Sequence, residues 1–292
     1  MTRKHNRWGW VFVSPYIFAL LAFTLIPLIA SIYFSLCRYD MFDPPKFIGL
    51  KNYKYIIFEY ERTWVGFRNT WLFGLFHLTL DTSVACVLAV MLNQKIKGIG
   101  FFRVVYFMPV LTPLTAVALV WSLMYQPTNG ILNTLFGYIG LGPFQYTYSK
   151  NYLEIILSIV ATTVWKGVGS TTIYLIAGLQ SISTDVMEAA EIDGANGLQK
   201  FFKITIPLLS PTLFFLLITG AAGCLQVFEQ FFLMLQNTGA EAYVVNGLIY
   251  DFVWSAEGKI GQGAALGWVS FVFIAILTIV QKVGEKRWVH YE

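Results

Sequence analysis

The sequence predicts an all-α integral membrane protein with six transmembrane helices. First, 57% of its 292 residues are hydrophobic and 12% are charged, with a mean hydropathy of +0.62. Soluble chains average about 45–50% apolar and about 25% charged residues, so a soluble core of this size could not bury the excess. Second, the apolar residues gather in long runs, and a helix needs about 20 such residues to cross a bilayer. We therefore expect a single transmembrane domain over residues 1–292.

Six runs are long enough to cross a membrane. The expected spans cover residues 10–36, 70–93, 104–125, 153–179, 206–235 and 264–283. The first follows a basic N-terminus, as a signal peptide would, but it is far longer than the ~7–15 residues of a signal sequence's apolar region. We expect it to be a retained helix. Prolines such as Pro27, Pro109 and Pro113 predict kinks that neighbouring helices must accommodate.

Basic residues predict the orientation of the chain. The short 94–103 connection and both termini carry clustered basic residues, among them Arg3, Lys97 and Lys286. Such residues favour the cytoplasmic side. The first outer loop, residues 37–69, also holds several basic residues and weakens the bias, and it is long enough to carry structure of its own. We expect both termini in the cytoplasm of a multi-pass protein of the cell membrane.

Cysteines and histidines give no sign of a metal site or a cofactor. Cys37, Cys86 and Cys224 are scattered, and the three histidines, His5, His77 and His290, stand far apart. These spacings match neither a disulfide framework nor metal ligands. We interpret the cysteines as small apolar fillers and the histidines as surface side chains, and we expect no catalytic residues.

The connection between the fourth and fifth spans, residues 183–205, is polar and helix-forming. Asp185 and Glu188 have the spacing of a helix start, and acidic side chains favour the N-terminus of a helix. Gly194 and Gly197 then allow the chain to turn. Small and acidic side chains suit a short helix that docks into a partner's groove. An amphipathic connector at the membrane surface is the alternative.

This connection resembles the EAA motif of ABC importer permeases. The motif reads E-A-A, three residues, G, nine residues, then I-x-L-P. Here Glu188–Ala190, Gly194, Ile204 and Pro207 stand at those spacings, with Ile206 in place of the usual Leu. Two further segments resemble the carbohydrate-uptake, maltose-type group of these permeases. They are Phe47–Tyr53, which matches F-x-G-L-x-N-Y, and Phe102-Arg103 followed by Pro109, which matches F-R-x(5)-P.

The resemblance implies a fold, partners and a function. It implies the type I ABC importer fold, a second permease subunit, two ATP-binding cassette subunits and an extracytoplasmic sugar-binding protein. The coupling helix in the cleft of an ATPase would then use Glu188, Ala189, Ala190, Asp193, Gly194 and Ala195. The chain has no G-x(4)-G-K-[ST] phosphate loop, so ATP hydrolysis belongs to a separate subunit.

Polar residues within the spans are candidates for a substrate pathway. A charge at mid-bilayer costs roughly 2.5–3.5 kcal/mol on insertion scales and usually faces the protein interior or a watery cavity. The candidates are Asp81, Trp165, Lys166, Gln226, Glu229 and Gln230. The last three are expected at i, i+3 and i+4 on one helical face. Hydrogen bonding between helices, including a pair between Lys166 and Glu229, is the competing interpretation.

The expected function is import of a sugar, with a neutral oligosaccharide preferred because a phosphorylated solute would favour several cations in the cavity and Lys166 is the only basic candidate in the middle of a span. A permease for glycerol-phosphate or another polar solute is an alternative. An ion-coupled secondary transporter is less well supported, because such proteins usually carry internal repeats and the sequence shows none.

Overall fold

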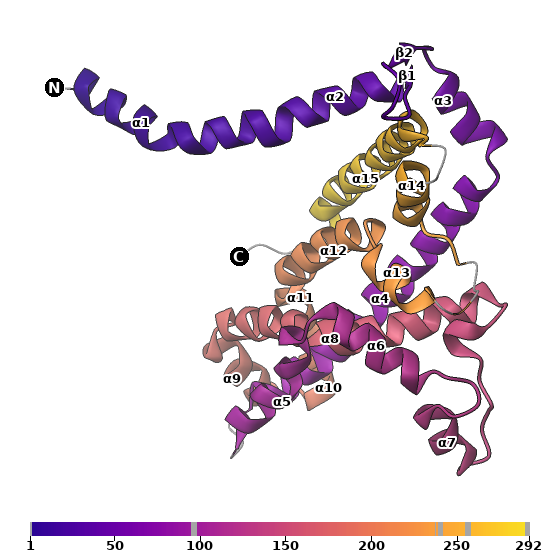
Figure 1. The fold of residues 1–292 in the computed structure, drawn as a ribbon. Coiled ribbons are helices and arrows are strands. Elements are labelled where there is room, and N and C mark those ends of the chain that lie inside the picture. Colours follow the sequence, from indigo (N-terminus) through magenta and orange to yellow (C-terminus); the bar gives the residue numbers. More distant parts are fainter. Residues whose placement is uncertain (1, 95–97, 237, 239–241, 255–257, 290–292) are drawn as a thin grey trace. The chain divides into compact units, whose positions relative to one another are not determined.

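The computed structural model describes residues 2–94, 98–236, 238, 242–254 and 258–289, and this part of the chain is mostly helical (Figure 1). It divides into two compact units, residues 1–63 with 248–272, and residues 64–247 with 273–292. The single domain expected from the sequence stays a prediction. Lys95 and Lys97, which contribute to the expected orientation, lie outside the described residues.

Among the described residues, four helices are long and apolar enough to cross a membrane, or up to six if each of two bent pairs counts as one span. The four cover Gly9–Ser35, Arg62–Leu92, Tyr152–Ser181 and Ile260–Lys286. The bent pairs are Ile99–Leu111 with Leu114–Met124, and Gly197–Leu208 with Ser210–Leu225. The expected six apolar segments are all present, but two of them are not single straight helices.

The first unit begins with α1 (Thr2–Leu20), the π-helical turn η1 (Leu21–Leu25) and α2 (Ile26–Ser35), which follow one another without a break. The π turn comes directly before Pro27, which has no N–H to donate within the helix. The amide of Ile26 bonds back to the carbonyl of Leu21, five residues earlier. A wider turn therefore accommodates the proline without ending the span.

The end of α2 is closed by a small folded segment. Strand β1 (Cys37–Arg38) pairs antiparallel with β2 (Lys46–Phe47), and α3 (Lys51–Lys54) and the π turn η2 (Tyr55–Glu59) follow. The side-chain amide of Asn52 donates to the carbonyls of Ser35 and Cys37, both at 2.8 Å. The Tyr53 hydroxyl lies 2.7 Å from the Ser35 hydroxyl. Part of the F-x-G-L-x-N-Y segment thus pairs carbonyls that the end of a helix leaves open.

Helices α14 (Val245–Trp254) and α15 (Ile260–Trp288) contribute the rest of the first unit through residues 248–272. The indole N–H of Trp268 donates to the Ser31 hydroxyl at 3.1 Å. A Cβ atom on Gly261 would collide with the carbonyl of Cys37. A glycine at this position therefore lets α15 begin against the end of α2.

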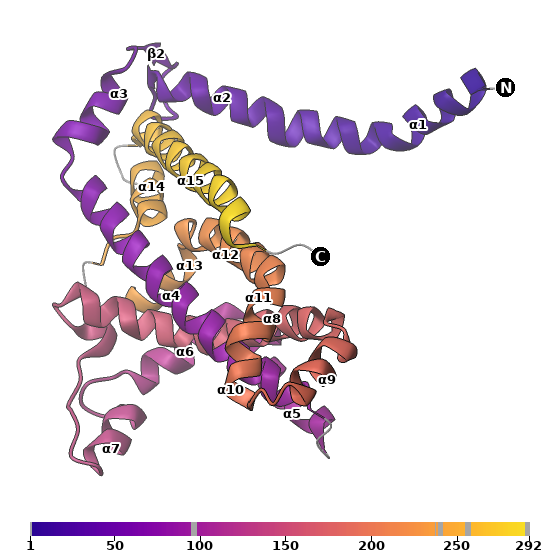
Figure 2. The ribbon, with the colours of Figure 1, turned by 180° about the vertical axis from the view of Figure 1, so that it is seen from behind.

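Helix α8 is the centre of the second unit, where α5, α6, α12 and α13 all contact it (Figures 1 and 2). The longer helices of this unit are α4 (Arg62–Leu92), α5 (Ile99–Leu111), α6 (Leu114–Met124), α8 (Tyr152–Ser181) and α12 (Ser210–Leu225). The shorter ones are α7 (Ile131–Gly137), η3 (Tyr146–Tyr148), α9 (Thr184–Ile192), α10 (Gly197–Lys200), η4 (Phe201–Thr205), α11 (Ile206–Leu208) and α13 (Glu229–Leu235).

Three of the expected spans need correction. The helix expected over 70–93 begins at Arg62. The span expected over 104–125 bends by 95° between α5 and α6, where Pro113 removes a backbone donor. The span expected over 206–235 bends by 63° before α12, and α12 ends at Leu225, ahead of the separate helix α13. Hydropathy detects apolar length, whereas the direction of the chain within an apolar run depends on packing.

Close packing of α8 against its neighbours uses glycines. A Cβ atom on Gly169 would lie 2.9 Å from the carbonyl oxygen of Tyr106 and 3.0 Å from a methyl of Val110, both on α5. Small residues at such crossings let helix backbones approach closely in a membrane. Elsewhere on α5, Gly100 has open space where a Cβ would be.

We expect Gly169→Ala to destabilise the protein by about 1–3 kcal/mol, because the backbone of α5 must move to admit the methyl group. Thermal unfolding of the purified chain in detergent measures the change. Gly100→Ala is the control and should leave the midpoint unchanged or higher. Equal midpoints for both variants would contradict close contact between α5 and α8.

Candidate functional site

The connection that carries the motif folds into two short helices, and Gly194 ends the first of them. Gly194 has φ +78°, a left-handed conformation that glycine adopts without steric cost. Its amide donates to the carbonyl of Glu191 at 3.0 Å, and the amide of Ala195 donates to that of Ala190 at 2.9 Å. This pair of bonds is the Schellman motif, which pairs carbonyls left open at the end of a helix.

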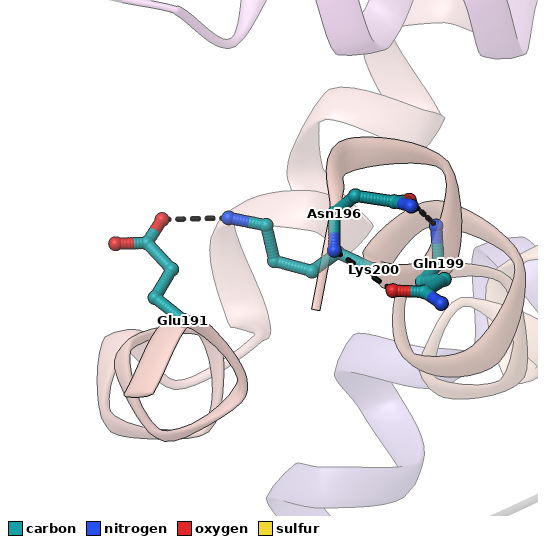
Figure 3. Close-up of polar contacts among 4 residues, drawn as sticks. All are labelled: Glu191, Asn196, Gln199 and Lys200. Atoms are coloured by element: carbon teal, nitrogen blue, oxygen red, sulfur yellow. Dashed lines mark hydrogen bonds and ion pairs between the residues drawn. The ribbon is translucent and has the colours of Figure 1, made fainter. Parts of the chain in front are cut away.

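The second helix begins at a reciprocal cap. The Asn196 side chain accepts from the amide of Gln199, and the Gln199 side chain accepts from the amide of Asn196, both at 2.9 Å (Figure 3). The Lys200 ammonium donates to the Glu191 carboxylate at 2.6 Å and so joins α10 to α9 (Figure 3). This ion pair holds the pKa of Glu191 below its usual value. The turn between α9 and α10 is therefore held by side chains at both ends.

The start of α9 differs from the expected one. The N-cap is Ser183, whose hydroxyl accepts from the amide of Asp185 at 3.2 Å. Asp185 lies in the first turn, where its charge favours the helix dipole, but it does not cap the helix. Ser, Asp and Asn all serve as caps, and several such residues precede the helix, so the sequence alone did not decide which one acts.

Several apolar side chains of this connection are exposed. Ile192 is 87% exposed, Leu198 73% and Phe202 65%. Sequence reasoning missed Ile192 and Leu198, although both stand beside motif residues. Glu188, Ala189, Asp193 and Gly194 are exposed and Ala195 is partly so, whereas Ala190 is buried in the chain. The connection thus presents a mixed apolar and acidic surface.

Four of the six substrate-pathway candidates line one cavity of about 840 Å³ in the second unit. They are Lys166 on α8 and Gln226, Glu229 and Gln230 around the break after α12. His77, Ser170 and Asn246 also line it and were not predicted as site residues. The cavity therefore has hydrogen-bonding groups from α4, α8, α14 and the broken segment.

The arrangement of the three residues near the break differs from the expected helical face. Gln226 caps the end of α12, and Glu229 begins α13, so the three do not lie at i, i+3 and i+4 of one helix. The Asn246 side chain donates to the carbonyl of Gln226 at 2.8 Å. Non-helical backbone at membrane depth is tolerated where it lines a cavity or finds such partners. These side chains therefore line the cavity from both sides of the break.

A polar face of α4 meets α8 beside this cavity. His77 Nδ1 lies 3.2 Å from the Thr163 hydroxyl, and the Thr171 hydroxyl donates to Asp81 Oδ2 at 2.6 Å. His77 also stacks on Phe73, with ring centroids 5.4 Å apart. His77 is therefore a half-buried residue within a span, and its interpretation as a surface side chain was wrong. Its place four residues before Asp81 is the signal that could have identified it.

Trp165 and Lys166 take different environments. Trp165 is 44% exposed and packs edge-on against Trp121 at 5.7 Å, outside the cavity lining that the described residues form. The Lys166 ammonium donates to the carbonyl of Val110 at 3.3 Å. Within the described ranges, Lys166 and Glu229 form no ion pair, so both can face the cavity.

Within the part of the chain that the structure describes, no group of three or more His, Cys, Asp or Glu side chains is placed to hold a metal ion. Among the described residues, the cavity has one cation, Lys166, and one carboxylate, Glu229, and its other polar groups are amides, two hydroxyls, a thiol and an imidazole. Such a lining can hydrogen-bond a polar solute without a strong preference for either sign of charge.

Comparison with known proteins places this chain in a family. Residues 82–290 match the family described as "Binding-protein-dependent transport system inner membrane component". The chain is 31% identical to the probable ABC transporter permease protein YesP of Bacillus subtilis, over 99% of this chain and 94% of that protein. It is 32% identical to the trehalose/maltose transport system permease protein MalF of Thermococcus litoralis, over 97% and 96%.

A solved structure has the same fold. A chain of a bacterial ABC transporter involved in the import of the acidic polysaccharide alginate superposes with a TM-score of 0.83 at 21% identity, covering 97% of this chain and 96% of that one. With the apolar helices and the match over residues 82–290, this chain belongs to the family of inner membrane components of binding-protein-dependent transport systems, and it is a multi-pass permease rather than an enzyme.

Proposed function

We propose that this chain is the permease subunit of an ATP-driven importer for a neutral oligosaccharide delivered by an extracytoplasmic binding protein. It pairs with a second permease subunit and rests on two ATP-binding cassette subunits. The observation that carries the proposal is the cavity around the break between α12 and α13, which collects hydrogen-bonding groups, mostly uncharged and with one cation and one carboxylate, inside a membrane protein of this family.

The connection 183–205 docks into an ATPase subunit on the cytoplasmic side, which is also where both termini lie. Its exposed Ile192, Leu198 and Phe202 support a docking surface, because exposed apolar side chains in one polar connection are available to a partner. Glu188, Ala189, Asp193, Gly194 and Ala195 form the coupling contact. Ala190 supports it from beneath, since it is buried and its carbonyl accepts the bond from Ala195.

The chemistry of the cavity supports a sugar as the solute. Amide, carboxylate and imidazole groups can pair with the hydroxyls of a saccharide, and Phe73 and Phe228 among the lining residues provide apolar ring surface. Relatives named as trehalose/maltose and arabinooligosaccharide permeases support the same class. Gln226, Glu229 and Gln230 are the proposed contacts. Lys166 lies on the pathway, and Trp165 supports the α6–α8 wall.

A glycerol-phosphate solute is the second candidate, and the cavity favours it less. Recognition of a phosphate uses several cationic or backbone N–H donors. Lys166 already donates to a carbonyl, and Glu229 would repel an anion. An ion-coupled transporter is a further alternative, for which uptake without ATP would be the sign.

We expect Gly194→Val to uncouple ATP hydrolysis from transport. Valine at φ +78° costs about 1–2 kcal/mol and would open the turn that sets the docking surface. Gly197→Ala is the control, because that glycine has open space and no left-handed backbone. Uptake and ATPase activity of the reconstituted complex measure the effect. Normal uptake by Gly194→Val, or an equal loss in both variants, would contradict the coupling role.

Breaking the ion pair between Glu191 and Lys200 should loosen the connection. Glu191→Gln is expected to speed amide hydrogen exchange over residues 184–205, and the double variant Glu191→Lys with Lys200→Glu should slow it again. Because the pKa of Glu191 is lowered in the folded chain, the pair persists at neutral pH and is lost only as pH falls through that lowered value. Unchanged exchange in Glu191→Gln would show that the caps alone hold the turn.

Substitution in the cavity should weaken sugar uptake. Gln226→Ala and Glu229→Gln are each expected to raise the KM for uptake about 2–10-fold, the loss of one or two hydrogen bonds. Thr219→Val is the control, since that hydroxyl bonds to its own helix outside the cavity. A panel of neutral, acidic and phosphorylated sugars in the reconstituted complex identifies the solute. Stimulation by phosphorylated sugars alone would overturn the neutral assignment.

A further inference from the structure

A polar pocket of about 600 Å³ lies within the first unit. It is formed by the folded segment after α2 and by the start of α15. Among the described residues, three cationic side chains line it, Arg38, Lys51 and Lys259, together with one carboxylate, Asp40. The backbone amides of Asp43 and Phe42 bond to Asp40 Oδ1 at 2.9 and 3.1 Å and keep the pKa of this carboxyl low. The pocket is therefore positively charged, with one fixed anion.

The pocket lies where two membrane spans end. Arg38 comes three residues after Ser35, the last residue of the first span, and Lys259 comes directly before Ile260, the first residue of the last span. Residues so close to the end of a span lie at the depth of the lipid headgroups. Lys and Arg at this depth attract anionic lipid groups, and basic pockets between spans hold them.

One residue that lines the pocket, Gln262, has a hydrogen-bond acceptor that is unpaired within the described part of the chain. The side-chain oxygen Oε1 of Gln262 is closed off from solvent and has no partner among the described residues, so a donor in the pocket reaches it when the Gln262 side chain turns. A buried acceptor without a partner is costly, and most such atoms find one. A free phosphate ion carries P–OH donors as well as acceptors, but it has no acyl chains to hold it at the end of a span. A headgroup that carries a phosphate and an ammonium or hydroxyl group satisfies the three cations and also Gln262 and Asp40.

We propose that this pocket binds one phospholipid whose headgroup joins a phosphate to a hydrogen-bond donor, such as phosphatidylethanolamine or phosphatidylglycerol. The phosphate lies between Arg38, Lys51 and Lys259, and the donor end faces Gln262 and Asp40. The bound lipid links two parts of the first unit, namely the folded segment after α2 and the start of α15. An acidic side chain of the binding protein is the competing occupant, and it is less suited because it offers no donor to Gln262.

Native mass spectrometry of the full-length chain tests the proposal, with equal amounts of phosphatidylcholine, phosphatidylethanolamine and phosphatidylglycerol present in the detergent. Phosphatidylcholine has the phosphate but no donor. We expect one retained lipid, with the two donor-bearing lipids preferred about 3–10-fold over phosphatidylcholine, the effect of one hydrogen bond. Excess inorganic phosphate should not displace it.

Substitutions test the contacts to the phosphate and to the donor end of the headgroup separately. Lys51→Gln and Arg38→Gln should each lower retention of every lipid about tenfold, because each removes a charge-assisted contact. Lys46→Gln, which removes the same charge from the neighbouring strand β2 outside the pocket, should not. Gln262→Met should keep the lipid and lose the preference over phosphatidylcholine. Thermal unfolding of each variant confirms that it is folded.

Three results would overturn the proposal. If the unaltered chain retained phosphatidylcholine as well as it retained the two donor-bearing lipids, Gln262 would have no role in recognition. An equal loss of lipid retention in Lys46→Gln and Lys51→Gln would show that general surface charge, and not this pocket, retains the lipid. Lipid retention unchanged in Lys51→Gln, with weaker capture of the binding protein by the assembled transporter, would assign the pocket to protein docking. Failure of sugar transport has no bearing on these outcomes, since none of them measures uptake.

Discussion

The structure depends on one constraint, which is that a membrane helix cannot end or break unless its free backbone groups find partners. Water is scarce in the bilayer, and each unpaired carbonyl or amide there costs several kcal/mol. The chain meets this constraint with single side chains at defined points. Asn52 pairs the carbonyls at the end of α2, and Asn246 pairs the carbonyl of Gln226 where α12 ends.

These breaks are also where the residues with proposed functions lie. Gln226, Glu229 and Gln230 line one cavity from the end of α12 and the start of α13. The connection 183–205 meets the same constraint, because its helix ends also find partners for their backbone groups. Its Schellman turn at Gly194 and the cap of Asn196 leave the exposed apolar and acidic side chains on a firmly held backbone. A docking element that is already folded loses less entropy on binding than a flexible one.

The polar pairs between α4 and α8 show a second consequence of the bilayer. Thr171 and Asp81, and Thr163 and His77, meet in surroundings that offer few other partners. Such contacts specify which helix faces which, while the glycines at the α5–α8 crossing determine how closely two helices approach. Together they position the wall of the cavity that Lys166 and Ser170 line.

By itself, the sequence determined that the chain crosses a membrane several times, where its apolar segments lie and which connection carries the motif. These properties depend on local composition and spacing, and a helix satisfies its own backbone wherever an apolar run is long enough. The prolines predicted kinks, but the tertiary structure decided how far the chain bends at Pro113 and before α12, where it breaks at Gln226 and that Ala190 is buried. The break at Gln226 depends on Asn246, a partner distant in sequence, so no local pattern could reveal it.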